Sequence, residues 1–177
     1  MGNIEDAARD GYVFVLSVDG VHCPINEPHP WSSKWSSHKL GGHAAVNYEL
    51  GVFINEDRLG WVNGPFPAGK CPDLAVFRIG LKEALSPGTK IIGDRGYRGE
   101  PDFISTANGL DPRELAEFKE RVLSRHESFN QRIKNYKCLS ERFRHNLELH
   151  KTCFEAVCAI TMYEIESGAT SLLDPYP

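Results

Sequence analysis

Two aspartates each follow a short apolar run of the kind that forms a buried strand. Asp19 comes directly after the run Tyr12–Val18, and Asp94 comes directly after the run Thr89–Gly93. A glycine lies close by in both cases, so we expect each carboxylate at an edge of the sheet rather than inside the core. If the two strands are neighbours, the carboxylates converge and can bind the divalent cations that assist phosphodiester cleavage.

An aspartate beside a glycine is also ordinary turn chemistry, so neither residue alone establishes a site. Cleavage of a phosphodiester with two metal ions needs a third acid, and spacing does not identify it. The candidates lie in or near one predicted helix: Glu114, Glu117, Glu120, Glu127 and Glu141. Most glutamates on a helix surface are simply solvated. Asp73 follows Pro72, and we interpret it as a helix-start residue rather than as a metal ligand.

The elements that position these acids have the order βββαβ, followed by helices. Strands are expected over residues 12–18, 44–55, 59–62 and 89–93, and helices over about 72–85, 112–136 and 148–166. The first strand should end at Asp19, and the second alternates in polarity, which predicts one buried and one wetter face. This order predicts an α/β (α+β) domain with a mixed sheet, as in a ribonuclease H-like fold.

Length and composition favour one domain, over residues 12–170, with a flexible start (1–11) and a C-terminal tail (171–177). The 177 residues are 41% hydrophobic, enough for a sizeable core. The longest apolar run is far shorter than a membrane span, and the first residues do not resemble a signal peptide. Five cysteines without a CxxC pair suggest reduced thiols rather than disulfides or zinc. We therefore expect a soluble, intracellular protein.

Charge is unevenly distributed along the chain. The formal net charge is −4, yet residues 113–151 carry ten lysines and arginines against six acids. This stretch could favour phosphate groups, although a solvated helix face explains it equally well. The exposed-face candidates for DNA contact are Asn130, Gln131, Arg132, Lys134 and Lys137. Trp31, Trp35 and Trp61 could stack on unpaired bases, but packing is the more common role of tryptophan.

Five segments in order resemble Harbinger-type DDE transposases, specifically their DDE superfamily endonuclease domain. They are SVDGVHCPINEP, GVFINEDRLGWVNGPFPAGKCPD, IIGDRGYRGEP, SRHESFNQRIKNYKCLSERFRH and HKTCFEAVCAITMYEIESG. Together they span almost the whole chain, so the resemblance is far more specific than any dipeptide. The family's two aspartates then fall on Asp19 and Asp94, and its glutamate falls on Glu127. The resemblance implies cleavage and strand transfer on DNA in the nucleus, with two Mg²⁺ or Mn²⁺ ions.

The helical period places Glu127 roughly 150° from the centre of the apolar stripe of its helix, so it is not a core residue. It reaches the aspartates only if the helix crosses the sheet edge or bends near residues 124–125. Two other functions stay open: a transposase-derived binding module that has lost catalysis, and a general metal-dependent phosphodiesterase. The resemblance also suggests a separate DNA-recognition protein as a partner, and a homo-oligomer is a further option.

Overall fold

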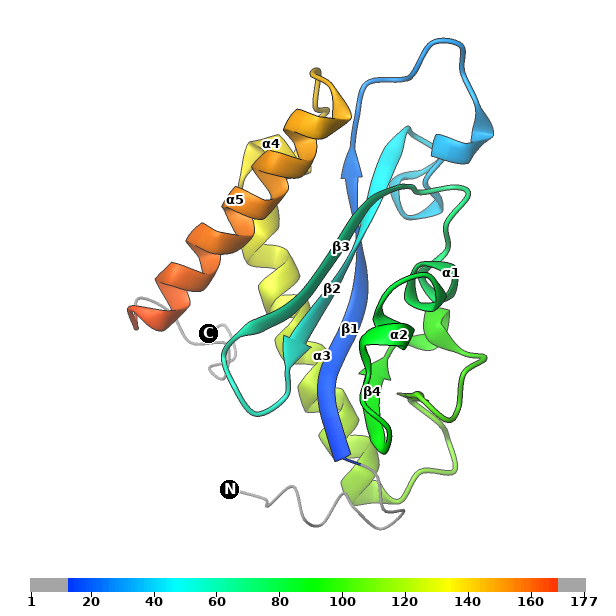
Figure 1. Cartoon of the computed structure of the whole chain (residues 1–177), viewed down its shortest axis with the longest axis vertical. Helices are drawn as coiled ribbons and strands as arrows, with labels where there is room; N and C mark the ends of the chain where they lie inside the picture. Colours follow the sequence, from blue (N-terminus) through cyan, green and yellow to red (C-terminus); the bar gives the residue numbers. More distant parts are fainter. Residues whose placement is uncertain (1–12, 169–177) are drawn as a thin grey trace.

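The fold is built on a five-stranded mixed sheet. The computed structural model describes residues 13–168, so the expected flexible start and tail lie outside the described residues. The strands are β1 (Val13–Pro24), β2 (Ala45–Phe53), β3 (Leu59–Pro67), β4 (Thr89–Gly93) and β5 (Ile104–Thr106), in the order β3-β2-β1-β4-β5. β1 pairs antiparallel with β2 and parallel with β4 (Figure 1). This confirms the predicted mixed sheet of a ribonuclease H-like fold.

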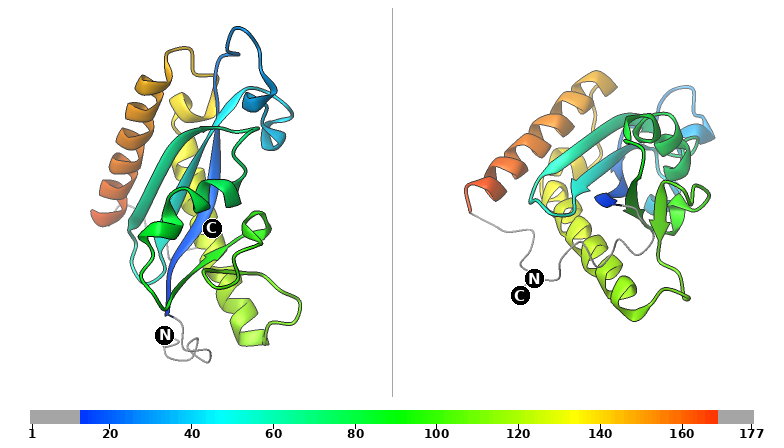
Figure 2. Two further views of the ribbon diagram at one scale, coloured as in Figure 1. Left: turned by 45° about the vertical axis from the view of Figure 1, so that its right-hand side comes forward. Right: turned by 60° about the horizontal axis from the view of Figure 1, so that its bottom comes forward.

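Helices pack on both faces of this sheet. On one face, α3 (Arg113–Lys134), α4 (Lys137–Ser140) and α5 (Leu147–Glu166) share a core with Val21 and Tyr48. On the other, α1 (Asp73–Arg78) and α2 (Leu81–Ala84) pack against Leu16 and Val18. The two layers are visible on opposite sides of the strands in Figure 2. Within residues 13–168, no helix is long and apolar enough to cross a membrane.

The strands differ from the sequence prediction in two respects that matter for the site. β1 does not end at Asp19 but continues to Pro24, because β2 pairs with it as far as Ala45. β2 is buried along nearly its whole length rather than on one face, because helices cover both faces of the sheet. The Asp-Gly pair therefore lies inside a strand rather than in a turn.

Three smaller differences concern element lengths. β3 extends to Pro67 rather than ending near residue 62, and the short strand β5 was not predicted. The helix expected over 72–85 is divided into α1 and α2, with Ile79 and Gly80 between them. The two long helices have nearly the predicted limits, since their apolar periodicity is continuous.

α3 lies along β1 and is held to it by two polar contacts. Ser17 Oγ lies 2.8 Å from His126 Nδ1, and Asn130 Nδ2 donates to Asp19 Oδ2 over 2.8 Å. The spacings match, because four residues of helix advance about 6 Å and two residues of strand advance nearly 7 Å. α3 is thus fixed to the central strand β1 beside Asp19, rather than crossing the edge of the sheet.

Candidate metal centre

The unequal lengths of β1 and β4 bring Asp19 and Asp94 together. The strands run parallel, and Val18 is paired with Gly93, the last residue of β4. Asp94 therefore leaves the sheet next to Asp19, at a point where β1 continues without β4 beside it. The side chain of Asp94 caps the 3-10 turn η4 (Arg95–Tyr97) by accepting a hydrogen bond from Gly96 N over 2.7 Å.

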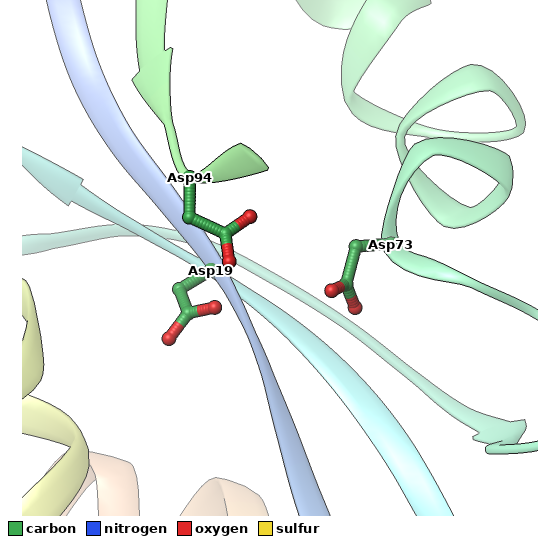
Figure 3. A group of neighbouring side chains, drawn as sticks. All are labelled: Asp19, Asp73 and Asp94. Atoms are coloured by element: carbon green, nitrogen blue, oxygen red, sulfur yellow. The ribbon is translucent and has the colours of Figure 1, made fainter. Parts of the chain in front are cut away.

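A third carboxylate reaches the same place from α1. One oxygen each of Asp19, Asp73 and Asp94 lie within 4.8 Å of one another. Figure 3 shows the three side chains gathered between β1, the end of β4 and the start of α1. Asp73 is the first residue of α1, as predicted, but its carboxylate is buried against β1 and Asn47 Nδ2 donates to it over 3.1 Å. Its interpretation as a helix-start residue alone was therefore incomplete.

Missing side chains on two glycines make room for Asp73. A β-carbon on Gly20 would collide with Asp73 Oδ1, and one on Gly96 would lie 3.1 Å from Asp73 Oδ2. The first of these contacts is closer than any real β-carbon tolerates, so a side chain at residue 20 excludes this position of Asp73. Residue 20 is thus a glycine because of packing: it lies in a strand without a positive φ, and a side chain there would take the space of Asp73.

Burial sets the electrostatics of Asp19. Desolvation raises the pKa of the Asp19 carboxyl to about 6, and Asp94 and Asp73 add to the rise. The Lys39 ammonium and the Gly20 backbone N–H, which donates to Oδ1 over 2.7 Å, act in the opposite direction. Packing three carboxylates so closely disfavours their common ionisation unless positive charge is supplied.

Lys39 supplies such a charge. It lies in the 3-10 turn η3 (His38–Leu40), and its Nζ lies 3.4 Å from Asp73 Oδ2 and 3.8 Å from Asp19 Oδ1. Nζ also donates to the Gly20 carbonyl over 3.0 Å. Burial disfavours the lysine charge, but Asp19, Asp73 and Asp94 outweigh this effect and raise the Lys39 pKa.

Glu127 lies apart from the three aspartates but lines a cavity together with two of them, Asp19 and Asp94. Its carboxylate is exposed on α3 and is not among the three that lie within 4.8 Å. Asp19, Asp94, Arg95, Glu120 and Glu127 are among the residues that line a cavity of about 700 Å³. The predicted triad is thus brought to one cavity, with two members adjacent and Glu127 on another part of the wall.

One comparison with known proteins decides the family. A model described as DDE superfamily endonuclease matches residues 18–161. The chain belongs to this family. No curated protein and no solved structure gives a significant match to this DDE endonuclease domain.

The residues predicted to contact DNA separate into two groups in this DDE endonuclease domain. Gln131, Lys134 and Lys137 are exposed on α3 and α4, as the helical phase predicted. Asn130 and Arg132 are buried instead, and Asn130 is bonded to Asp19. The buried face of α3 is wider than its apolar residues alone predicted. It also includes polar residues, such as Asn130, which contacts β1.

The histidine and tryptophans near the site have mainly structural contacts. His22 is buried, and its Nδ1 lies 2.6 Å from Ser37 Oγ, the side chain that caps η3. Desolvation lowers the His22 pKa to about 4. Trp61 Nε1 donates to buried Glu49 over 2.9 Å and Trp35 packs on the core, whereas Trp31 is exposed.

Asp73 and Lys39 are the two site residues that the sequence reasoning missed. The signal for Asp73 was present, because its segment ends one of the family-like blocks, but helix-start chemistry offered a sufficient local explanation. Lys39 lies in a Ser- and Gly-rich loop with no periodic pattern. Its place at the site depends on the folding of that loop, which no local spacing predicts.

Proposed function

We propose that this domain is a metal-dependent DNA endonuclease and strand transferase of the DDE transposase class. The observation that carries the proposal is the convergence of Asp19, Asp73 and Asp94 in a member of the DDE superfamily endonuclease family. Carboxylate oxygens are the ligands that Mg²⁺ and Mn²⁺ prefer. A cluster of three acids, gathered where β4 ends beside β1, is the donor set that such an ion requires.

The residues present fit a divalent cation. The three carboxylates offer oxygen donors from three elements, and a lysine ammonium already lies against two of them. Asp19, Asp73 and Asp94 would hold one ion. Glu127, elsewhere on the cavity wall, would complete a second site with Asp19 or Asp94 after a local movement of its side chain. When bound, two ions stabilise charge on the attacking and leaving oxygens of the phosphodiester.

The protein's own groups orient these ligands. Asn130 fixes one oxygen of Asp19 and the Gly20 N–H fixes the other, while the Gly96 N–H holds Asp94. The side-chain amide of Asn47, on β2, donates a hydrogen bond to Asp73. Each of the three proposed ligands is thus oriented by a hydrogen bond from a backbone N–H or a side-chain amide, as is usual for metal-binding carboxylates.

DNA would enter from the cavity side, where Arg95 lines the wall and the exposed groups Gln131, Lys134 and Lys137 continue along α3 and α4. These residues suit contacts with the phosphate backbone, which position a duplex without reading its sequence. We therefore propose that recognition of a specific end depends on a separate DNA-recognition protein. From the resemblance to Harbinger-type elements, we also propose that the protein acts in the nucleus.

The proposal is tested by nicking of supercoiled plasmid in Mg²⁺ and Mn²⁺. We expect metal-dependent nicking by the wild type and its loss, by at least a hundredfold, in Asp94→Asn. The exposed Asp102→Asn is the matched control and should retain activity. DNA binding without nicking by the wild type would favour a binding module that has lost catalysis. Equal cleavage of RNA and DNA would favour a general phosphodiesterase.

A further inference from the structure

Lys39 lies where a divalent cation would compete with it. Its Nζ contacts carboxylate oxygens of both Asp19 and Asp73, and these are two of the three ligands proposed above. Two cations that share such ligands repel each other, with an energy that increases as the local dielectric falls. Only about a third of the Lys39 side chain is exposed, so solvent screens this repulsion incompletely.

The position of Lys39 is built into the loop that carries it. Ser37 Oγ caps η3 by accepting from Leu40 N over 3.1 Å, and the same oxygen contacts buried His22 of β1. Gly42 N donates to the Ser37 carbonyl over 2.8 Å and closes the turn. The turn that carries Lys39 is therefore fixed to β1 through His22. The same strand carries Asp19, three residues earlier.

We propose that Lys39 is an internal counter-ion of the metal centre, which holds Asp19 and Asp73 together until a divalent cation takes its place. This inference rests on the proposed metal site and adds a step to its loading: the ammonium leaves the carboxylates as the ion binds. The centre is thereby stable without metal, and the exchange lowers its apparent affinity. Charge-assisted hydrogen bonds of this kind account for roughly a tenfold change in a binding constant, or more.

The test compares Mn²⁺ binding, measured by electron paramagnetic resonance of the free ion, in the wild type, Lys39→Gln and Lys34→Gln. Lys34 lies in the same loop but contacts the ring of Trp35 rather than the acids. Its substitution therefore removes the same charge from the loop without removing a contact with the acids. We expect Lys39→Gln to bind Mn²⁺ about tenfold more tightly than the wild type. Lys34→Gln should stay within about twofold. Unchanged or weaker binding by Lys39→Gln would overturn the proposal.

Thermal unfolding gives a second signature that a merely structural lysine would not produce. In EDTA, Lys39→Gln should unfold at a lower temperature than the wild type, because three carboxylates lose their counter-ion. In saturating Mn²⁺, the deficit should largely disappear, since the metal supplies the missing charge. A deficit of equal size with and without metal would show that Lys39 is only a packing residue and would contradict the exchange.

NMR of the wild type keeps the proposal testable if Lys39→Gln does not fold. With ¹⁵N-lysine, the Lys39 ammonium should give a protected signal that Mg²⁺ titration moves toward the position of solvated lysines. A signal that Mg²⁺ leaves in place, in a protein shown to bind the ion, would overturn the counter-ion role and leave the metal site intact. If neither the wild type nor Asp94→Asn binds metal, the proposed function itself fails.

Discussion

Asp73 Oδ1 occupies the space that a side chain on Gly20 would fill. This contact joins the start of α1 to the middle of β1, and it puts Asp73 beside Asp19. The absence of a β-carbon at residue 20 is thus a condition for the three-acid cluster, and it can be tested by adding one methyl group.

Gly20→Ala should displace Asp73 and weaken metal binding by tenfold or more. The collision also overpacks the site, at a cost of about 1–3 kcal/mol in the free energy of unfolding. Mn²⁺ affinity and urea unfolding measure the two effects. Gly109→Ala is the control, because open space surrounds residue 109 and the change should leave both quantities near wild type. Normal Mn²⁺ binding by Gly20→Ala would argue that Asp73 is not a ligand.

Glu127→Gln should separate metal binding from cleavage. The three aspartates lie together without Glu127, so we expect Mn²⁺ affinity at the first site to change by less than about threefold while nicking falls at least a hundredfold. Asp94→Asn, by contrast, should lose both. Glu120→Gln is the matched control, since Glu120 is another α3 glutamate that lines the cavity. Full nicking activity in Glu127→Gln would remove this residue from the catalytic set.

Asn130→Ala should weaken both the attachment of α3 and the aim of Asp19. The variant loses a part-buried hydrogen bond to a carboxylate, which contributes about 1.5–3 kcal/mol to stability, and Asp19 gains freedom to turn away from the proposed metal site. We expect a lower urea midpoint and reduced nicking that excess Mn²⁺ restores only in part. Ser128→Ala, which removes an exposed contact within α3, should change neither. An unaltered urea midpoint in Asn130→Ala would contradict the attachment role.

The buried carboxyl of Glu49 should make the free energy of unfolding depend on pH even without metal. Burial raises the Glu49 pKa to about 7 from 4.5, so the folded state binds a proton more tightly than the unfolded state. Its contribution to stability is present below about pH 4.5 and is lost as the pH rises through about 7. Glu49→Gln keeps an acceptor for Trp61 but does not ionise.

The check is urea unfolding of the wild type and Glu49→Gln in EDTA at several pH values. The free energy of unfolding of the wild type, minus that of the variant, should fall by about 2–3 kcal/mol between pH 4.5 and pH 7.5. Taking the difference cancels the buried histidines, whose lowered pKa values act in the opposite direction. A difference that is independent of pH would show that Glu49 ionises normally in the fold.

Long helices with a continuous apolar periodicity were predictable from the sequence. Features that depend on pairing with a distant strand were not. α3 and α5 follow the predicted limits closely because apolar residues recur through both helices. The end of β1 was mispredicted because Asp19-Gly20 resembles a turn, while its pairing with β2 is a property of a distant segment. Asp19 and Asp94 were brought together as predicted, since the apolar stretches that precede them prove to be parallel neighbours.

The cluster of acids draws one member each from β1, α1 and the turn after β4, so a form of the chain in which any of these three is unfolded does not present all three acids. An ion that binds them selects the form in which these three elements are assembled and shifts the folding equilibrium by mass action, by about 2.7 kcal/mol at a hundred times its dissociation constant. The supply of divalent cations would then govern how much of the protein persists as well as how fast it acts.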